Sequence, residues 1–96
     1  MRKAYIFIYS DSTGGRETLK AWANAEPAVL HWRYDMPHAL YLISEQDASV
    51  LSDSFIEFNG NKGRFLIMEA SDNRQGRLPS ETWYLLRNKQ QKPKDG

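Results

Sequence analysis

The spacing of hydrophobic and polar positions changes several times along this chain, and the order of the changes predicts the fold. Segments with the pattern of a β-strand are residues 3–9, 29–34, 38–44 and 64–70. Segments with apolar residues at helical spacing are residues 15–25 and 47–58. The resulting order, β-α-β-β-α-β, is typical of the ferredoxin-like fold. We therefore predict an α+β fold with an antiparallel sheet in the order 4-1-3-2 and two helices on one face.

The first and third predicted strands are apolar on both faces. In the first strand, one face carries Ile6 and Ile8, and the opposite face carries Tyr5, Phe7 and Tyr9. A strand that is covered on both sides belongs in the middle of a sheet. The predicted order places these same two strands in the middle, so the local pattern and the topology agree.

The sequence predicts one more helix and a polar tail after the last strand. Residues 79–88 carry Trp83 and Leu86 at helical spacing, with Ser80 as a candidate cap. Residues 89–96 are polar, contain three lysines and one proline, and are predicted to be disordered. Residues 1–88 are therefore expected to form a single domain.

Two helices can cover only one face of the predicted sheet, and the other face is apolar in either register. Three kinds of cover are possible: the C-terminal segment, a second copy of the chain, or stacked nucleic-acid bases. We predict the first two together, and hence a homodimer. The residues predicted to form the dimer interface are Tyr5, Phe7, Tyr9 and Trp83.

The composition narrows the classes of function. Thirteen Lys and Arg residues against twelve Asp and Glu give a net charge of +1, so contact with nucleic acid requires a local basic patch. The absence of cysteine excludes disulfides, thiolate zinc sites and cysteine nucleophiles. No segment approaches the roughly 20 apolar residues of a membrane span, and the N-terminal apolar run is too short for a signal peptide. We expect a cytoplasmic protein without membrane contact.

The best local basic patch involves three arginines. Arg74 and Arg77 share one predicted loop, and Arg16 follows the glycine pair of SDSTGGR (10–16) before a helix. Guanidinium groups make forked contacts to phosphate, so these residues are the predicted nucleic-acid contacts. The alternatives are a solvated surface balanced by Asp72 and Glu81, and a simple flexible turn at residues 10–16.

Two further patterns bear on metal binding. His31 and His38 flank the predicted hairpin, but a zinc site needs three or four ligands, so exposed histidines are the alternative. Asp11 follows the first strand, and its alternative role is to cap the next helix or to form an Asx turn.

Several short motifs resemble the small CRISPR-associated endoribonuclease superfamily, and in particular its stand-alone, non-CRISPR relatives. The motifs are IFIYSD (6–11), LHWRY (30–34), LYLIS (40–44), RFLIMEAS (64–71) and GRLPSETWYLLRN (76–88). The resemblance spans nearly the whole chain and implies a ferredoxin-like homodimer. In the nuclease members, an acid that directly follows the strand-one tyrosine holds a divalent metal together with its counterpart from the other protomer. Asp11 is the matching residue here, but Ser10 stands between it and Tyr9.

Three functions follow as alternatives. The leading prediction is a non-catalytic interaction module that binds nucleic acid or a protein partner and needs no cofactor. The second is a Mg²⁺-dependent endoribonuclease in which Asp11 of each protomer is the catalytic and metal-binding residue. The third is a small inhibitor or antitoxin-type protein that blocks a partner enzyme.

Overall fold

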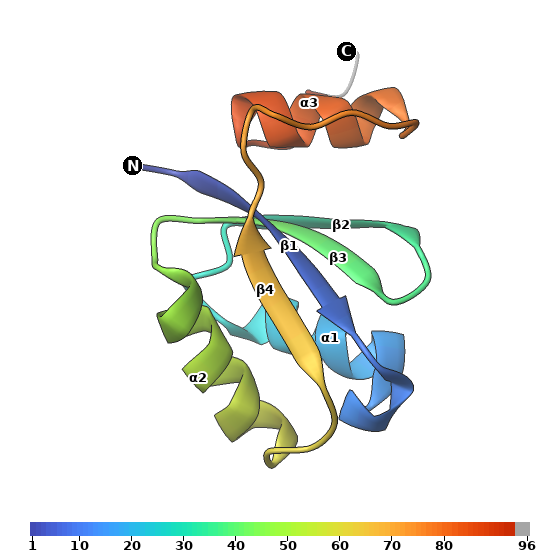
Figure 1. Ribbon diagram of the computed structural model, residues 1–96. Helices are drawn as coiled ribbons and strands as arrows, with labels where there is room; N and C mark the ends of the chain where they lie inside the picture. The colour runs from blue at the N-terminus through green and yellow to red at the C-terminus, as the bar shows by residue number, and fades with distance from the viewer. Residues whose placement is uncertain (94–96) are drawn as a thin grey trace.

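The computed structural model describes residues 1–93 and has the predicted order of elements (Figure 1). The four strands are β1 (Lys3–Tyr9), β2 (His31–Met36), β3 (Ala39–Ser44) and β4 (Phe65–Glu69). The helices are α1 (Gly15–Ala25), α2 (Ala48–Asn59) and α3 (Ser80–Asn88), with a short 3-10 turn at Asp11–Thr13. The strands pair antiparallel in the order β2-β3-β1-β4. Read from the opposite edge, this is the predicted order 4-1-3-2.

The face of the sheet under α1 and α2 holds the main core. β1 points Tyr5, Phe7 and Tyr9 toward these helices, and all three side chains are buried. The ring of Phe7 lies 5.5 Å from that of Trp22 on α1 and 4.9 Å from that of Phe55 on α2. The prediction that Tyr5, Phe7 and Tyr9 form a dimer interface is therefore wrong, because the chain's own helices already cover them.

α3 covers part of the opposite face, as expected for the C-terminal segment (Figure 1). Its Leu85 and Leu86 are buried against Ala4, Tyr41 and Ile43 of the central strands. This second, smaller core buries only the end of the sheet that lies nearest the helix. Trp83, the fourth residue predicted at the interface, is half-buried at the margin of this cluster.

One residue of the predicted tail, Gln91, contacts β2. The Gln91 side-chain amide donates a hydrogen bond of 2.8 Å to the backbone carbonyl of Trp32. Residues 94–96, the rest of the tail predicted to be disordered, lie outside the described residues. Within residues 1–93, no helix has both the length and the apolar character needed to cross a membrane.

Candidate binding surfaces

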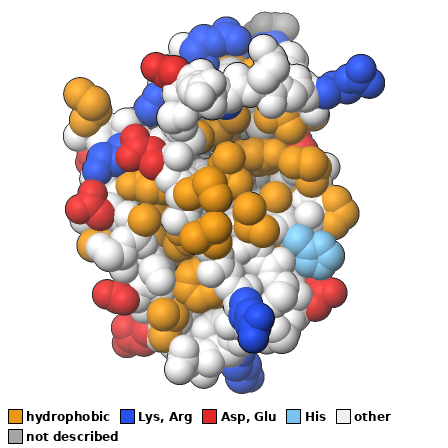
Figure 2. All heavy atoms as spheres, in the orientation of Figure 1, with side chains coloured by type: hydrophobic (Ala, Val, Ile, Leu, Met, Phe, Trp, Pro, Cys, Tyr) orange, Lys and Arg blue, Asp and Glu red, His pale blue; other side chains and the backbone are white. Residues whose placement is uncertain are grey.

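Four large apolar side chains lie exposed on the part of the sheet that α3 leaves uncovered. They are Ile8, Met36, Leu66 and Met68, with exposed fractions of 45%, 45%, 53% and 42%, and we call this set the open face. The strand register puts them on one face: Ile8 pairs with Leu66, Met68 lies two residues beyond Leu66 on β4, and Ala39 of β3 lies between Ile8 and Met36. Figure 2 shows the hydrophobic side chains gathered over the sheet beneath α3. Such a cluster on one face is typical of an interaction surface.

A hollow lies between the open face and the segment that leads into α3. Its volume is about 300 Å³. Met36 and Ile6 line it from the sheet, and Leu78 and Trp83 line it from the C-terminal segment. Trp83 is therefore placed beside the open face, so the one predicted interface residue outside the main core stands next to the apolar surface.

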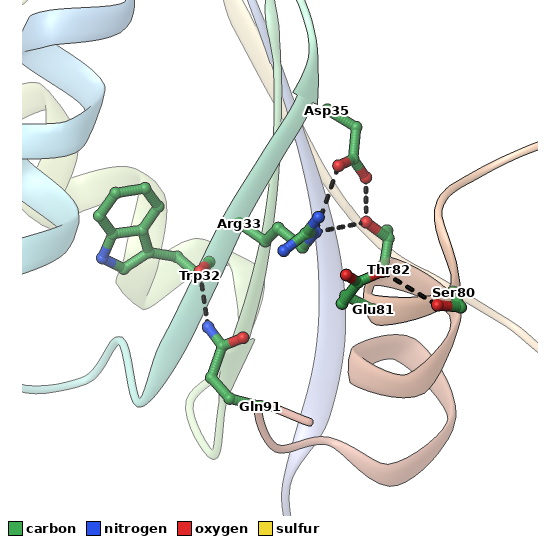
Figure 3. A network of polar contacts seen from close by, with 7 residues as sticks. All are labelled: Trp32, Arg33, Asp35, Ser80, Glu81, Thr82 and Gln91. Carbon is green, nitrogen blue, oxygen red and sulfur yellow. Dashed lines mark hydrogen bonds and ion pairs between the residues drawn. The ribbon is translucent and has the colours of Figure 1, made fainter. Parts of the chain in front are cut away.

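A buried polar network fixes α3 to the edge strand β2 (Figure 3). The Arg33 Nε–H donates to the Thr82 hydroxyl at 2.7 Å and to the Asp35 carboxylate at 3.2 Å. The Thr82 hydroxyl in turn donates to the second carboxylate oxygen of Asp35. Because Thr82 is fully buried and the Asp35 side chain is only 6% exposed, this contact fixes how far α3 reaches over the sheet.

The three arginines of the predicted basic patch lie in two separate places. Arg74 donates to the Ser71 carbonyl at 2.8 Å and lies 3.7 Å from Asp72, so part of its charge is already balanced. Arg77 is exposed in the same loop. Arg16 lies on α1, in the helical layer on the other side of the sheet (Figure 1). Arg74 and Arg77 both line the hollow beside the open face, whereas Arg16 lies apart from them.

Asp11 begins the 3-10 turn after β1, and its carboxylate faces solvent and His38. The His38 Nε2 lies 2.8 Å from the Asp11 Oδ1, and the Asp11 side chain is 86% exposed. Asp11 does not cap α1, whose N-cap residue is Gly14. The intervening Ser10 accepts a hydrogen bond from the Arg64 backbone N–H and exchanges one with Ser12, which ties this turn to the start of β4.

The described part of the chain does not assemble a metal centre around Asp11. No group of three His, Cys, Asp or Glu side chains suited to a metal occurs within residues 1–93. His31 pairs with Ile43 at the start of β2, whereas His38 lies in the hairpin beyond the other end of that strand, so the two do not form a ligand pair. Under the nuclease alternative, the metal would be shared by Asp11 of two copies, with water molecules completing its coordination.

A second hollow, about 370 Å³ in volume, runs between α1 and the edge strand β2. We call it the edge groove, and its lining residues are Arg16, Lys20, Trp32, Arg33, Tyr34 and Gln91. Trp32 and Arg33 leave β2 on opposite sides (Figure 3), so the groove follows the strand's free edge. Among these residues, the sequence pattern had pointed only to Arg16. The i, i+4 spacing of Arg16 and Lys20, which puts both on one helix face, was the available signal for Lys20.

The chain was compared with known protein families, curated proteins and solved structures, and none of the three comparisons gives a match. The open face and the edge groove are therefore the features from which a function can be inferred.

Proposed function

We propose that this protein is a homodimeric, non-catalytic interaction module that pairs through the open face of its sheet. The observation that carries the proposal is the set of four exposed apolar side chains, from β1, β2 and β4, on the part of the sheet that α3 leaves uncovered. Burial of apolar surface contributes about 25 cal/mol per Å², so covering such a set favours association. A second copy of the chain is the partner we propose, because every copy in solution carries the same apolar surface.

The geometry also suggests how two copies would fit. The largest apolar patch on a monomer is about 300–600 Å², whereas a stable interface buries about 800 Å² on each partner. The open face must therefore be joined by neighbouring surface. The Trp83 and Leu78 flank of the C-terminal segment borders the same hollow, so a two-fold dimer can lay this flank of each copy over the open face of the other.

The net charge of the chain is consistent with such pairing. A net charge of +1 produces little repulsion between two copies. The proposed homodimer also agrees with the resemblance to the CRISPR-associated endoribonuclease-like superfamily, which we retain as a proposal.

The cytoplasm is the compartment we propose, because a chain of this size without cysteine gains nothing from an oxidising environment.

The oligomeric state in solution tests the proposal. The mass of the full chain is measured by light scattering on a sizing column and by sedimentation, over a range of protein concentrations. The test variant is Leu66→Glu, which puts a charge into the open face. The matched control is Val50→Glu, because Val50 is 46% exposed on α2, away from the open face. We expect a dimer for the wild type and for Val50→Glu, and a folded monomer for Leu66→Glu.

A wild-type chain that stays monomeric at the highest concentration overturns the proposal, as does a Leu66→Glu variant that stays dimeric. A monomer that instead forms a stoichiometric complex with one other protein, lost in Leu66→Glu, would favour the inhibitor alternative. Mg²⁺-dependent RNA cleavage that is lost in Asp11→Ala would replace the non-catalytic assignment with the nuclease alternative.

A further inference from the structure

We propose that the edge groove binds a nucleotide unit, with its phosphate on Arg16 and Lys20 and its base against Trp32. The groove lies between α1 and β2, whereas the open face belongs to the opposite side of the sheet. The two surfaces share no side chain, so the nucleotide site does not depend on the proposed dimer.

The lining of the groove is cationic. Three of its six lining residues are basic and none is acidic. The Arg33 side chain is already hydrogen-bonded to Asp35 and Thr82. Neither Arg16 nor Lys20 forms an ion pair with any of residues 1–93. Positive and negative charges nearly cancel over the whole chain, so two unpaired cations facing one hollow are a local excess that suits an anion.

Arg16 is held in position before any ligand arrives. Its guanidinium carbon lies 4.8 Å from the centre of the Tyr34 ring, a cation–π contact that leaves the N–H groups at its edge available. The Tyr34 hydroxyl donates to the backbone carbonyl of Arg16 at 3.4 Å. Burial and the neighbouring Tyr9 hydroxyl raise the pKa of Tyr34, so it remains a protonated donor at neutral pH. A preorganised guanidinium loses little entropy when it grips a phosphate.

Trp32 supplies an aromatic surface beside these cations. Its indole N–H donates to the Asn24 side-chain oxygen at 3.0 Å, which fixes the plane of the ring. The ring stands edge-on to Tyr34, with their centres 5.8 Å apart. A half-buried ring of fixed orientation offers a face on which a base can stack, as aromatic residues do in proteins that bind single strands.

The combination of features selects a nucleotide over other anions. A bare phosphate or an acidic peptide would contact the two cations but not the aromatic surface. A nucleotide would contact both, through its phosphate and its base. The hollow's volume of about 370 Å³ lies near the lower end of the range for small-ligand sites, about 300–1,000 Å³. The nucleotide can be a free mononucleotide or one unit of a single strand that continues along β2, and the experiment separates these sources.

Binding is measured with the full chain and three probes. Adenosine 5′-monophosphate and inorganic phosphate are titrated while backbone amide NMR shifts are followed, and a fluorescein-labelled single-stranded RNA is followed by anisotropy at several salt concentrations. The test variant is Arg16→Gln/Lys20→Gln. The control is Lys62→Gln/Arg64→Gln, which removes the same charge from an exposed turn outside the groove. Thermal unfolding checks that both variants remain folded.

We expect nucleotide-induced shifts centred on residues 16–20 and 32–34, and at least about a tenfold weaker affinity in the groove variant. The control variant should lose less than about threefold at the same salt concentration. Binding of both the mononucleotide and the RNA identifies a nucleotide pocket. Binding of the RNA alone, with shifts at the same residues, identifies a single-strand groove. Equal losses in both variants, phosphate binding as strong as nucleotide binding, or no shift at these residues with any probe overturns the proposal.

Discussion

The Thr82 hydroxyl accepts a hydrogen bond of 2.7 Å from the Arg33 Nε–H, and this contact joins the last helix to the edge of the sheet. The same hydroxyl donates to Asp35, whose carboxylate is almost fully buried. Arg33, Thr82 and Asp35 therefore provide hydrogen-bond partners for one another. Without them, the buried Asp35 carboxylate would carry an unpaired charge. The contact is made by the first turn of α3, so it fixes where this helix begins over the sheet and hence how much apolar surface remains open.

Thr82→Val tests this contact, because the change keeps the shape of the side chain and removes its hydroxyl. The Asp35 carboxylate and the Arg33 guanidinium each lose a partner while still buried or half-buried. We expect the free energy of unfolding in urea to fall by about 1–3 kcal/mol. Ser80→Ala is the matched control, since Ser80 is exposed and donates only to Glu81, and should change stability by less than about 0.5 kcal/mol. Equal effects of the two changes would contradict the role given to the network.

Gly63 marks a second close contact, between the turn before β4 and the turn after β1. It has a φ of 72°, and a Cβ atom there would lie 2.5 Å from the Thr13 backbone nitrogen. We expect Gly63→Ala to destabilise the chain by about 1–3 kcal/mol, because it combines a strained backbone with a steric clash. Gly76→Ala is the control: a Cβ atom added there would meet nothing within 4 Å, so its effect should stay below about 0.5 kcal/mol. Thermal or urea unfolding of the pair measures the difference, and similar losses would refute the clash.

His31 makes stability depend on pH below neutrality. Its burial, with a smaller effect of Arg2, lowers its pKa from the usual 6.5. As the pH falls, the unfolded chain therefore takes up a proton on His31 at a higher pH than the folded chain does. The contribution of neutral His31 to stability is fully present above about pH 6.5. It declines as the pH falls from there through the pKa of His31 in the folded chain. We expect His31→Gln to flatten the stability profile between about pH 7 and pH 5, while His38→Gln keeps the slope due to His31. A profile that His31→Gln leaves unchanged would show that another group causes the slope.

The order of elements was predictable because each segment carries its own period. β1 and β3 were placed in the centre of the sheet because both of their faces are apolar. The same property left open which face of β1 meets the helices, since both the aromatic face (Tyr5, Phe7 and Tyr9) and the aliphatic face (Ile6 and Ile8) favour burial. Only the packing of Phe7 between the rings of α1 and α2 decides this. The error over the interface follows from that ambiguity.

The candidate sites were less predictable, because they depend on how separate elements meet. The edge groove joins Arg16 to Trp32, and no local pattern relates those two positions. The open face depends on the extent of α3, which is fixed by the contact of Thr82 with Arg33 across the chain. Arg74 and Arg77, which are close in sequence, do line one hollow, but Arg16 lies on the other side of the sheet.

Tyr5 and Tyr9 occupy the same buried face of β1 but differ in how their hydroxyls are satisfied. The Tyr5 hydroxyl donates to the Gln46 carbonyl at 2.6 Å. The Tyr9 hydroxyl is buried and has no hydrogen-bond partner in the described part of the chain; it lies close enough to Tyr34 to affect that residue's pKa but does not meet hydrogen-bond geometry. A buried hydroxyl without a partner costs about 1–3 kcal/mol of stability.

Replacing each tyrosine by phenylalanine should therefore affect stability differently. Tyr9→Phe removes an unsatisfied group and is expected to leave the free energy of unfolding unchanged or to raise it by up to about 1 kcal/mol. Tyr5→Phe removes a made hydrogen bond and leaves the Gln46 carbonyl without its donor, so it should lower stability by about 1 kcal/mol. Urea unfolding of the two variants under one condition gives the comparison. If Tyr9→Phe costs as much as Tyr5→Phe, the Tyr9 hydroxyl has a partner after all, and the Tyr34 hydroxyl beside it is the group to test next by Tyr34→Phe.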